Sequence, residues 1–192
     1  DFNISELIYG QNMQMMIYLF CVTKTGTGKY RDAHPAGILY MPSGALKNTA
    51  GRNADDVDKV KFGQYKMKGL VLNDPEVLNA MENGVGGVFI PAKLNKSGET
   101  AANSSVATNE QFRLLYEHVR RCAENMATTL RGGDISAVPL DLGNGVTACD
   151  YCDYKSVCGV DADDSGAVLP KSEADKREVF EILKKEADAD EL

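Results

Sequence analysis

The chain has 192 residues, of which 43% are hydrophobic and 26% charged, a composition typical of a globular protein with one sizeable core. Its formal net charge of −7 excludes a protein that coats nucleic acid by bulk positive charge, so any contact with DNA has to be local. No stretch approaches the roughly 20 apolar residues that a membrane span needs, and no secretion signal opens the chain. We therefore expect a cytoplasmic protein without membrane contact.

The first predicted element is a mostly buried helix over Ser5–Cys21, with Ser5 as its N-terminal cap. A connection rich in Gly and Thr leads to a buried strand over Pro35–Met41. Residues 53–69 are polar and carry the most basic stretch of the chain, which contains Lys59, Lys61, Lys66 and Lys68. The pattern thus predicts a helix and a strand near the start, followed by a charged segment.

A short helix is predicted from Pro75 to Met81, with Asp74 as its cap. The apolar segment Val88–Pro91 favours another strand, and residues 96–105 read as a loop rich in turns. The clearest helix runs over Thr108–Arg131, where Thr108 and Gln111 are spaced as a capping box. Its predicted buried face is formed by Phe112, Leu115, Val119, Cys122, Met126 and Leu130.

Beyond this helix, the sequence predicts a short strand over Ile135–Leu140 and a last helix, exposed and rich in charge, over Lys171–Ala187. The elements mix helices and strands, so the predicted fold class is α/β, in the mixed α+β sense. We expect three parts: a main domain at 1–147, a cysteine loop at 148–160, and an acidic linker with the C-terminal helix at 161–192.

Cysteine usage gives the strongest chemical signal. Five cysteines cannot all pair, and Cys149, Cys152 and Cys158 form a C-x2-C-x5-C array, which favours a bound metal over disulfides. Thiolates suit both zinc and iron–sulfur clusters, so the spacing does not choose between them. A fourth ligand is needed, and the only further candidates are Cys21, Cys122, His34 and His118. Of these, Cys122 lies on an apolar helix face and is better explained as a core cysteine.

Several blocks of sequence, in the same order, resemble the C-terminal nuclease region of the AddB family, which forms the second subunit in bacterial ATP-dependent helicase–nucleases. The blocks are Tyr9–Leu19, His34–Tyr40, Tyr65–Leu72, His118–Arg121, and the cysteine loop with Asp161 after it. The resemblance extends over nearly the whole chain. It implies part of a PD-(D/E)xK core, in which a mixed sheet flanked by helices presents carboxylates to Mg²⁺ for phosphodiester hydrolysis.

In such enzymes the catalytic Asp and the acidic-x-Lys pair precede a helix with the pattern Q-x-x-x-Y. That pattern corresponds here to Gln14 and Tyr18, which stack on one helix face and are expected to be accessory residues near the active site or DNA. The chain begins at Asp1 without a methionine, and we expect the catalytic residues to lie upstream. The parent is then an ATP-dependent exodeoxyribonuclease in double-strand break repair, and this fragment alone is predicted to be inactive.

The resemblance also implies that the cysteines bind a [4Fe-4S] cluster whose fourth cysteine lies far upstream. Without that donor, we expect an absent or incomplete cluster and a loose cysteine loop in this chain. The implied partners are DNA and an AddA-type helicase–nuclease subunit, in a heterodimer.

Weaker candidates for contact with DNA are the four lysines named above, together with Arg120 and Arg121. Asp153-Tyr154-Lys155 matches the acidic-x-Lys pattern but lies between cysteines in a loop, so we reject it as catalytic. Two alternative functions remain open: a zinc-stapled interaction module without catalysis, and a CRISPR-adaptation-type iron–sulfur exonuclease. The long stretch between Gln14 and Cys149 argues against the exonuclease.

Overall fold

The computed structural model describes residues 2–43, 62–136, 138–141, 146–158, 169–170 and 174–190. Lys59, Lys61 and Asp161, which the sequence analysis singled out, lie outside these residues. The described part has mixed α and β structure, as predicted. None of the helices within it has the length and apolar character needed to cross a bilayer.

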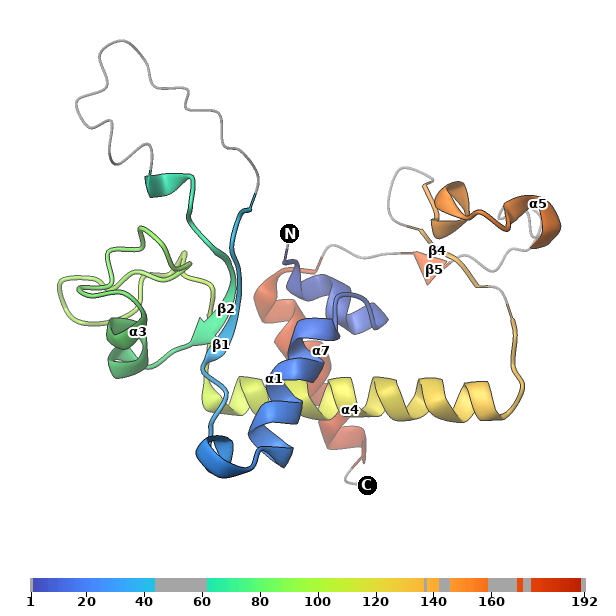
Figure 1. Cartoon of the computed structure of the whole chain (residues 1–192), viewed down its shortest axis with the longest axis horizontal. Helices are drawn as coiled ribbons and strands as arrows, with labels where there is room; N and C mark the ends of the chain where they lie inside the picture. Colours follow the sequence, from blue (N-terminus) through green and yellow to red (C-terminus); the bar gives the residue numbers. More distant parts are fainter. Residues whose placement is uncertain are drawn as a thin grey trace, which may run out of the picture.

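A small sheet lies beside a group of packed helices (Figure 1). Strand β1 (Gly37–Tyr40) pairs antiparallel with β2 (Lys68–Leu72), and β2 pairs in parallel with β3 (Val106–Ala107). The predicted strand at 35–41 is confirmed by β1. The central strand β2 was not predicted, because its first residue is the last lysine of a charged segment.

Strand β2 separates two apolar clusters, because successive residues of a strand point to opposite faces. Leu70 and Leu72 enter the main core, whereas Val71 packs into a smaller cluster with Leu78 and Val85. The strands approach closely at Gly69, which has φ of 152°, and a Cβ there would lie 2.0 Å from the backbone oxygen of Ile38. Any larger residue at position 69 would therefore push β1 and β2 apart.

The predicted helix over 5–21 is in fact two elements. A 3-10 helix, η1 (Ile4–Tyr9), is capped by Asn3 rather than by Ser5, and Gly10 ends it in the left-handed conformation. Helix α1 (Gln14–Thr25) begins four residues later. The single helix was a wrong prediction because the apolar spacing continues through the break, although Gly10 is a residue that typically ends helices.

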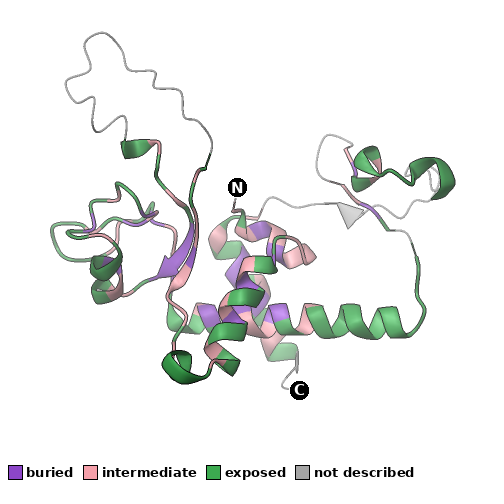
Figure 2. Cartoon of the chain, in the orientation of Figure 1, coloured by how far each residue is buried: buried purple, intermediate pink, exposed green. Residues whose placement is uncertain are grey.

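Helix α4 (Asn109–Arg131) confirms the clearest prediction, including the reciprocal hydrogen bonds between Thr108 and Gln111. Only the first half of its apolar face is buried, however. Phe112, Leu115 and Val119 are at most 5% exposed, whereas Met126 is 51% and Leu130 76% exposed. Figure 2 shows the second half of α4 extending beyond the core. The predicted burial of Met126 and Leu130 is therefore wrong within this chain.

Helix α7 (Lys176–Asp190) packs against α4 and η1, with Val179, Phe180 and Leu183 buried. The prediction of an exposed last helix is therefore wrong, because these three residues form an apolar stripe between charged neighbours. The short helix α3 (Pro75–Met81) is confirmed, and the side chain of Asp74 accepts from the backbone N–H groups of Glu76 and Val77.

Two predicted strands are corrected. The segment Val88–Pro91 bends around the carboxylate of Glu82, which accepts from the backbone N–H groups of Val88, Phe89 and Ile90 at 2.8 to 3.0 Å. Burial alone would raise the pKa of Glu82, but these hydrogen bonds lower it below its ordinary value. The other strand is limited to β4 (Leu140–Asp141), and Ile135 is 93% exposed.

Beyond the far end of α4 lies a separate small lobe (Figure 1). It contains β4, which pairs in parallel with β5 (Leu169–Pro170), the 3-10 helix η3 (Ala148–Tyr151) and the single turn α5 (Lys155–Cys158). We call these elements the cysteine lobe, since they carry Cys149, Cys152 and Cys158.

Candidate nuclease site

The Gln14 and Tyr18 side chains lie together on the exposed side of α1. Gln14 is the first residue of the helix, and its Nε2 donates a hydrogen bond of 2.8 Å to Oη of Tyr18, one turn later. The opposite side of the helix buries Met16 and Phe20 in the core, which fixes the direction in which the polar pair points. Tyr18 is 55% exposed, so the pair is accessible to a substrate.

Lys66 and Lys68 lie at the start of β2, and both are exposed. They line an open hollow of about 690 Å³, which Gly69 and Ser105 also border. The sequence analysis grouped these lysines with the two arginines of α4. The structure places the lysines at the sheet and the arginines on the long helix.

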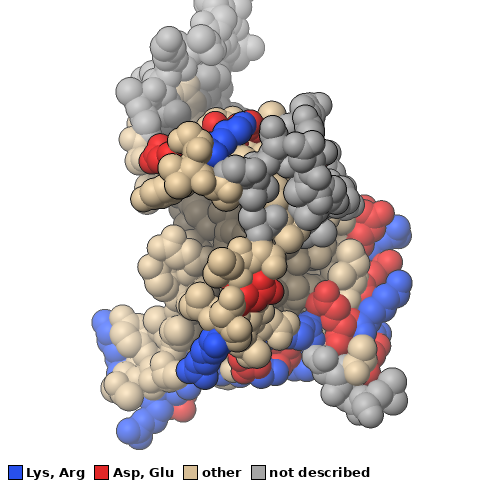
Figure 3. Space-filling view, turned by 90° about the vertical axis from the view of Figure 1, so that its right-hand side faces the viewer, with Lys and Arg blue, Asp and Glu red and all other residues tan. Residues whose placement is uncertain are grey.

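Arg120 and Arg121 both have acidic partners. Arg120 binds Glu117 and Glu124 on its own helix, and these hydrogen bonds raise the pKa of Arg120. Nη2 of Arg121 lies 2.7 Å from the Glu186 carboxylate on α7. Basic and acidic side chains also alternate on the face of the molecule shown in Figure 3, without one continuous basic surface.

His118 joins three elements at the same place. Its Nδ1 lies 2.9 Å from Oε2 of Glu186, and its Nε2 donates to the backbone oxygen of Leu7 at 2.8 Å. The side chain is almost fully buried, so these bonds hold η1 and α7 against α4. Sequence reasoning considered His118 only as a metal ligand and missed this role, since its two partners are distant in the sequence. Cys122, one turn later, packs against the core as predicted.

In the cysteine lobe, Cys149 is partly buried, whereas Cys152 and Cys158 are exposed. Thr147 caps η3, and Asp150 accepts in return from the backbone N–H of Thr147. Among the described residues, no group of three or more Cys, His, Asp or Glu side chains is arranged to hold a metal ion. The three thiols therefore have the right chemistry for a metal centre but are not gathered around one point.

Asp153-Tyr154-Lys155 lies in a turn that leads into α5, and Lys155 binds Asp150. A nuclease needs the acidic-x-Lys pair on a rigid strand that directs both side chains to one metal ion. The turn does not provide such a strand, which agrees with our rejection of this motif as catalytic.

Residues 3–159 match the family described as the PD-(D/E)XK nuclease superfamily. Curated relatives, named as the B-type component of an ATP-dependent helicase/deoxyribonuclease, align with nearly the whole chain. The protein from Clostridium novyi (strain NT) is 34% identical over 195 residues, covering 98% of this chain, and that from Alkaliphilus metalliredigens (strain QYMF) is 31% identical over 194 residues, covering 97%. The protein from Thermoanaerobacter sp. (strain X514) is 30% identical over 195 residues, covering 99%. The chain spans 17% of the length of each of these relatives.

Proposed function

Because the chain belongs to the PD-(D/E)XK nuclease superfamily, we propose that it forms part of a Mg²⁺-dependent deoxyribonuclease domain in a helicase–nuclease that processes DNA double-strand breaks. The observation that carries this proposal is the alignment of 97 to 99% of the chain with the B-type components of helicase/deoxyribonucleases. The other partner in this proposal is an AddA-type helicase–nuclease chain.

The described residues do not themselves fit a Mg²⁺ site, since they contain no suitable cluster of carboxylates. Before Gln14 the acidic residues are Asp1 and Glu6, and neither is followed two positions later by lysine. In the family order, the catalytic Asp and the acidic-x-Lys pair precede the Q-x-x-x-Y helix. The proposal therefore places them outside these 192 residues. When bound there, Mg²⁺ would activate water and stabilise charge on the phosphate.

Gln14 and Tyr18 have a supporting role in this proposal. Their exposed face is rigid, because the other side of α1 is packed into the core, and their mutual hydrogen bond restricts the rotamers of both side chains. Both groups can donate a hydrogen bond to a phosphate oxygen. We assign them the positioning of the DNA backbone next to the catalytic metal.

For the lysines and arginines, the proposed contact is with DNA phosphates. Lys66 and Lys68 border an open hollow, which gives a DNA strand direct access to them. Arg120 and Arg121 would first have to exchange their Glu partners for phosphate. We therefore expect the two lysines to contribute more to DNA affinity.

The three clustered cysteines are proposed as ligands of a [4Fe-4S] cluster, together with one cysteine from preceding polypeptide. Thiolates are the donors that such clusters use, and the two exposed cysteines are accessible to one. Because the three thiols are not gathered here, a donor from outside these residues has a defined task. It would draw the cysteine lobe toward the segment that precedes η1.

Tyr18→Phe tests the proposed function in a polypeptide extended upstream through the whole nuclease core. We expect kcat for Mg²⁺-dependent cleavage of linear DNA to fall about 10-fold or more, with little change in KM, because misplacing the reacting groups lowers the rate of the chemical step. Tyr30→Phe is the matched control, since Tyr30 is similarly exposed and lies outside the Q-x-x-x-Y pattern. Unchanged kcat in the Tyr18 variant would refute the assigned role.

A further inference from the structure

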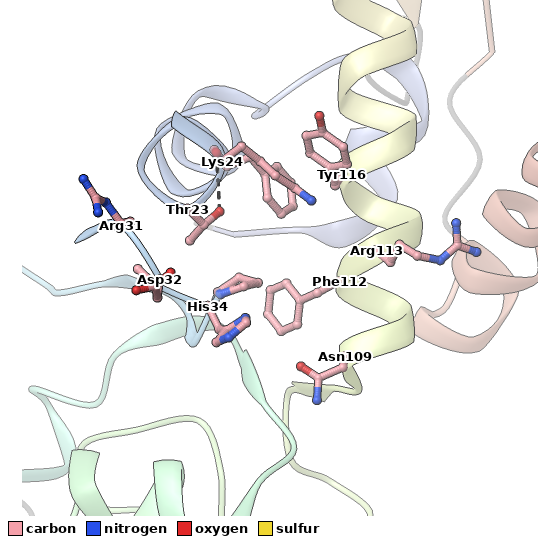
Figure 4. Close-up of a pocket in the computed structure, with 12 residues that line it drawn as sticks. Thr23, Lys24, Arg31, Asp32, His34, Asn109, Phe112, Arg113 and Tyr116 are labelled. Carbon is pink, nitrogen blue, oxygen red and sulfur yellow. Dashed lines mark hydrogen bonds between the residues drawn. The ribbon is translucent and has the colours of Figure 1, made fainter. Parts of the chain in front are cut away.

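A second concave site lies between α1, the connection at 31–35 and the first half of α4 (Figure 4). Its volume is about 420 Å³, which lies in the range of small-molecule sites and is sufficient for one nucleotide. The sequence analysis did not identify it, because its residues come from two stretches separated by more than seventy positions. It is lined on one side by Phe20 and Lys24 and on the other by Phe112 and Tyr116.

Aromatic side chains form the floor and one wall of this pocket. Phe20 and Phe112 are almost fully buried, and the ring of Tyr116 meets that of Phe20 edge to face, with centroids 5.4 Å apart. Phe112 projects from α4 toward His34, which lines the opposite side (Figure 4). Because the floor is packed into the core, the half-buried Tyr116 ring is held in place as a fixed apolar surface.

A cation already lies on that surface. Nζ of Lys24 is 4.5 Å from the centroid of the Tyr116 ring, a cation–π contact between α1 and α4. Arg31 lies at the rim with its guanidinium turned outward, and Asp32 is the acidic residue among those that line the pocket (Figure 4). Arg113 binds Glu110 and points away from the pocket. Lys24 and Arg31 therefore supply the positive charge, which exceeds that of Asp32 by one.

The pocket is distinct from the Gln14 and Tyr18 face. Phe20 follows Tyr18 by two positions and so lies about 200° around the helix from it. One side of α1 thus presents the Q-x-x-x-Y pair, and the other side contributes Phe20 and Lys24 to the pocket. A DNA strand at the first face would have to pass around the helix to reach the second.

We propose that this pocket binds one nucleotide of a single DNA strand. The base stacks on Tyr116, and Lys24 moves from the ring face to the adjacent phosphate, while Arg31 contacts the next phosphate at the rim. Aromatic faces combined with nearby cations are the general means by which proteins bind single strands without reading their sequence. A stacked base in a duplex cannot enter the pocket, so the site selects unwound DNA. The inference rests on the proposed function, because it assumes that DNA is the substrate.

The test uses the 192-residue chain and a fluorescein-labelled oligothymidine of about 12 nucleotides, a length within the range of single-strand site sizes. We expect Tyr116→Leu to weaken binding, measured by fluorescence anisotropy, about 5- to 100-fold through loss of base stacking. Lys24→Gln should weaken it and also lower the salt dependence of the affinity by about one phosphate contact. Lys96→Gln, which removes one charge from an exposed loop, is the control and should bind like the unmodified chain.

Two further arms separate stacking from charge and from misfolding. An abasic strand of the same length should bind equally to the Tyr116→Leu variant and to the unmodified chain, whereas Lys24→Gln should still weaken its binding. Tyr116→Phe keeps the ring face and the edge contact with Phe20, and it should bind oligothymidine normally. Loss of binding in Tyr116→Phe as well would show that the ring face is not the binding surface.

The inference and the proposed function can fail separately. If the unmodified chain binds oligothymidine and the Tyr116 and Lys24 variants bind it equally well, the pocket assignment is wrong while the nuclease proposal stands. If the unmodified chain does not bind single strands at all, the pocket assignment is again wrong. DNA cleavage by the longer polypeptide then decides the proposed function independently.

Discussion

Phe112→Ala is expected to destabilise the chain by about 3–5 kcal/mol, the usual cost of deleting a buried aromatic ring. Phe112 is 1% exposed and lies in the main core, together with Met16 and Phe20 of α1 and Leu115 of its own helix. Removing the ring leaves a cavity where α1, α4 and the sheet meet. Because domains are marginally stable, a loss of this size is a large fraction of the total.

Denaturant unfolding followed by circular dichroism measures this effect. Leu130→Ala is the matched control, because Leu130 is on the same helix but 76% exposed, and its change should stay within about 0.5 kcal/mol. Equal effects of the two substitutions would contradict the burial pattern along α4.

Cys152→Ser, made in a polypeptide that includes the upstream nuclease segment, is expected to abolish a [4Fe-4S] cluster. The unmodified longer polypeptide should contain about four iron and four sulfide ions, and the variant should lose most of both, because three thiolates do not hold such a cluster stably. Iron and sulfide analysis, together with the visible absorption of the cluster, measures the loss.

Cys21→Ser is the control for the cysteine experiment, since Cys21 is also exposed but belongs to α1. It should leave the iron content unchanged. One zinc ion and no sulfide in the longer polypeptide would instead support a zinc-stapled interaction module. The division of the chain at residues 147 and 160 stays a prediction, and an intact cluster would give it a physical basis.

The sequence predicted those elements whose signals are local. Helix α4 has a capping box within its first turn, and α3 has a cap followed directly by Pro75. Strand β2 lacks such a signal, because its apolar residues are few and follow Lys66 and Lys68. It is a central strand only because β1 and β3 lie on either side of it. Partners distant in the sequence decide its structure.

The same distinction holds for the candidate site. The spacing of Gln14 and Tyr18 predicts a shared helix face, and the structure adds their hydrogen bond and exposure. The partner of Arg121 is Glu186, 65 positions later, so no local pattern could indicate that its charge is paired. The pocket beside Tyr116 likewise depends on how α1 packs against α4.

The central claim is that this chain supports a nuclease whose catalytic carboxylates are supplied by polypeptide preceding Gln14. The most direct measurement compares cleavage of linear DNA with Mg²⁺ by the 192-residue chain and by a polypeptide extended upstream through the nuclease core. We predict cleavage by the longer polypeptide and none by the 192-residue chain. Sustained, Mg²⁺-dependent cleavage by the 192-residue chain alone would contradict the account, since it would require an active site among residues to which we assign no catalytic role.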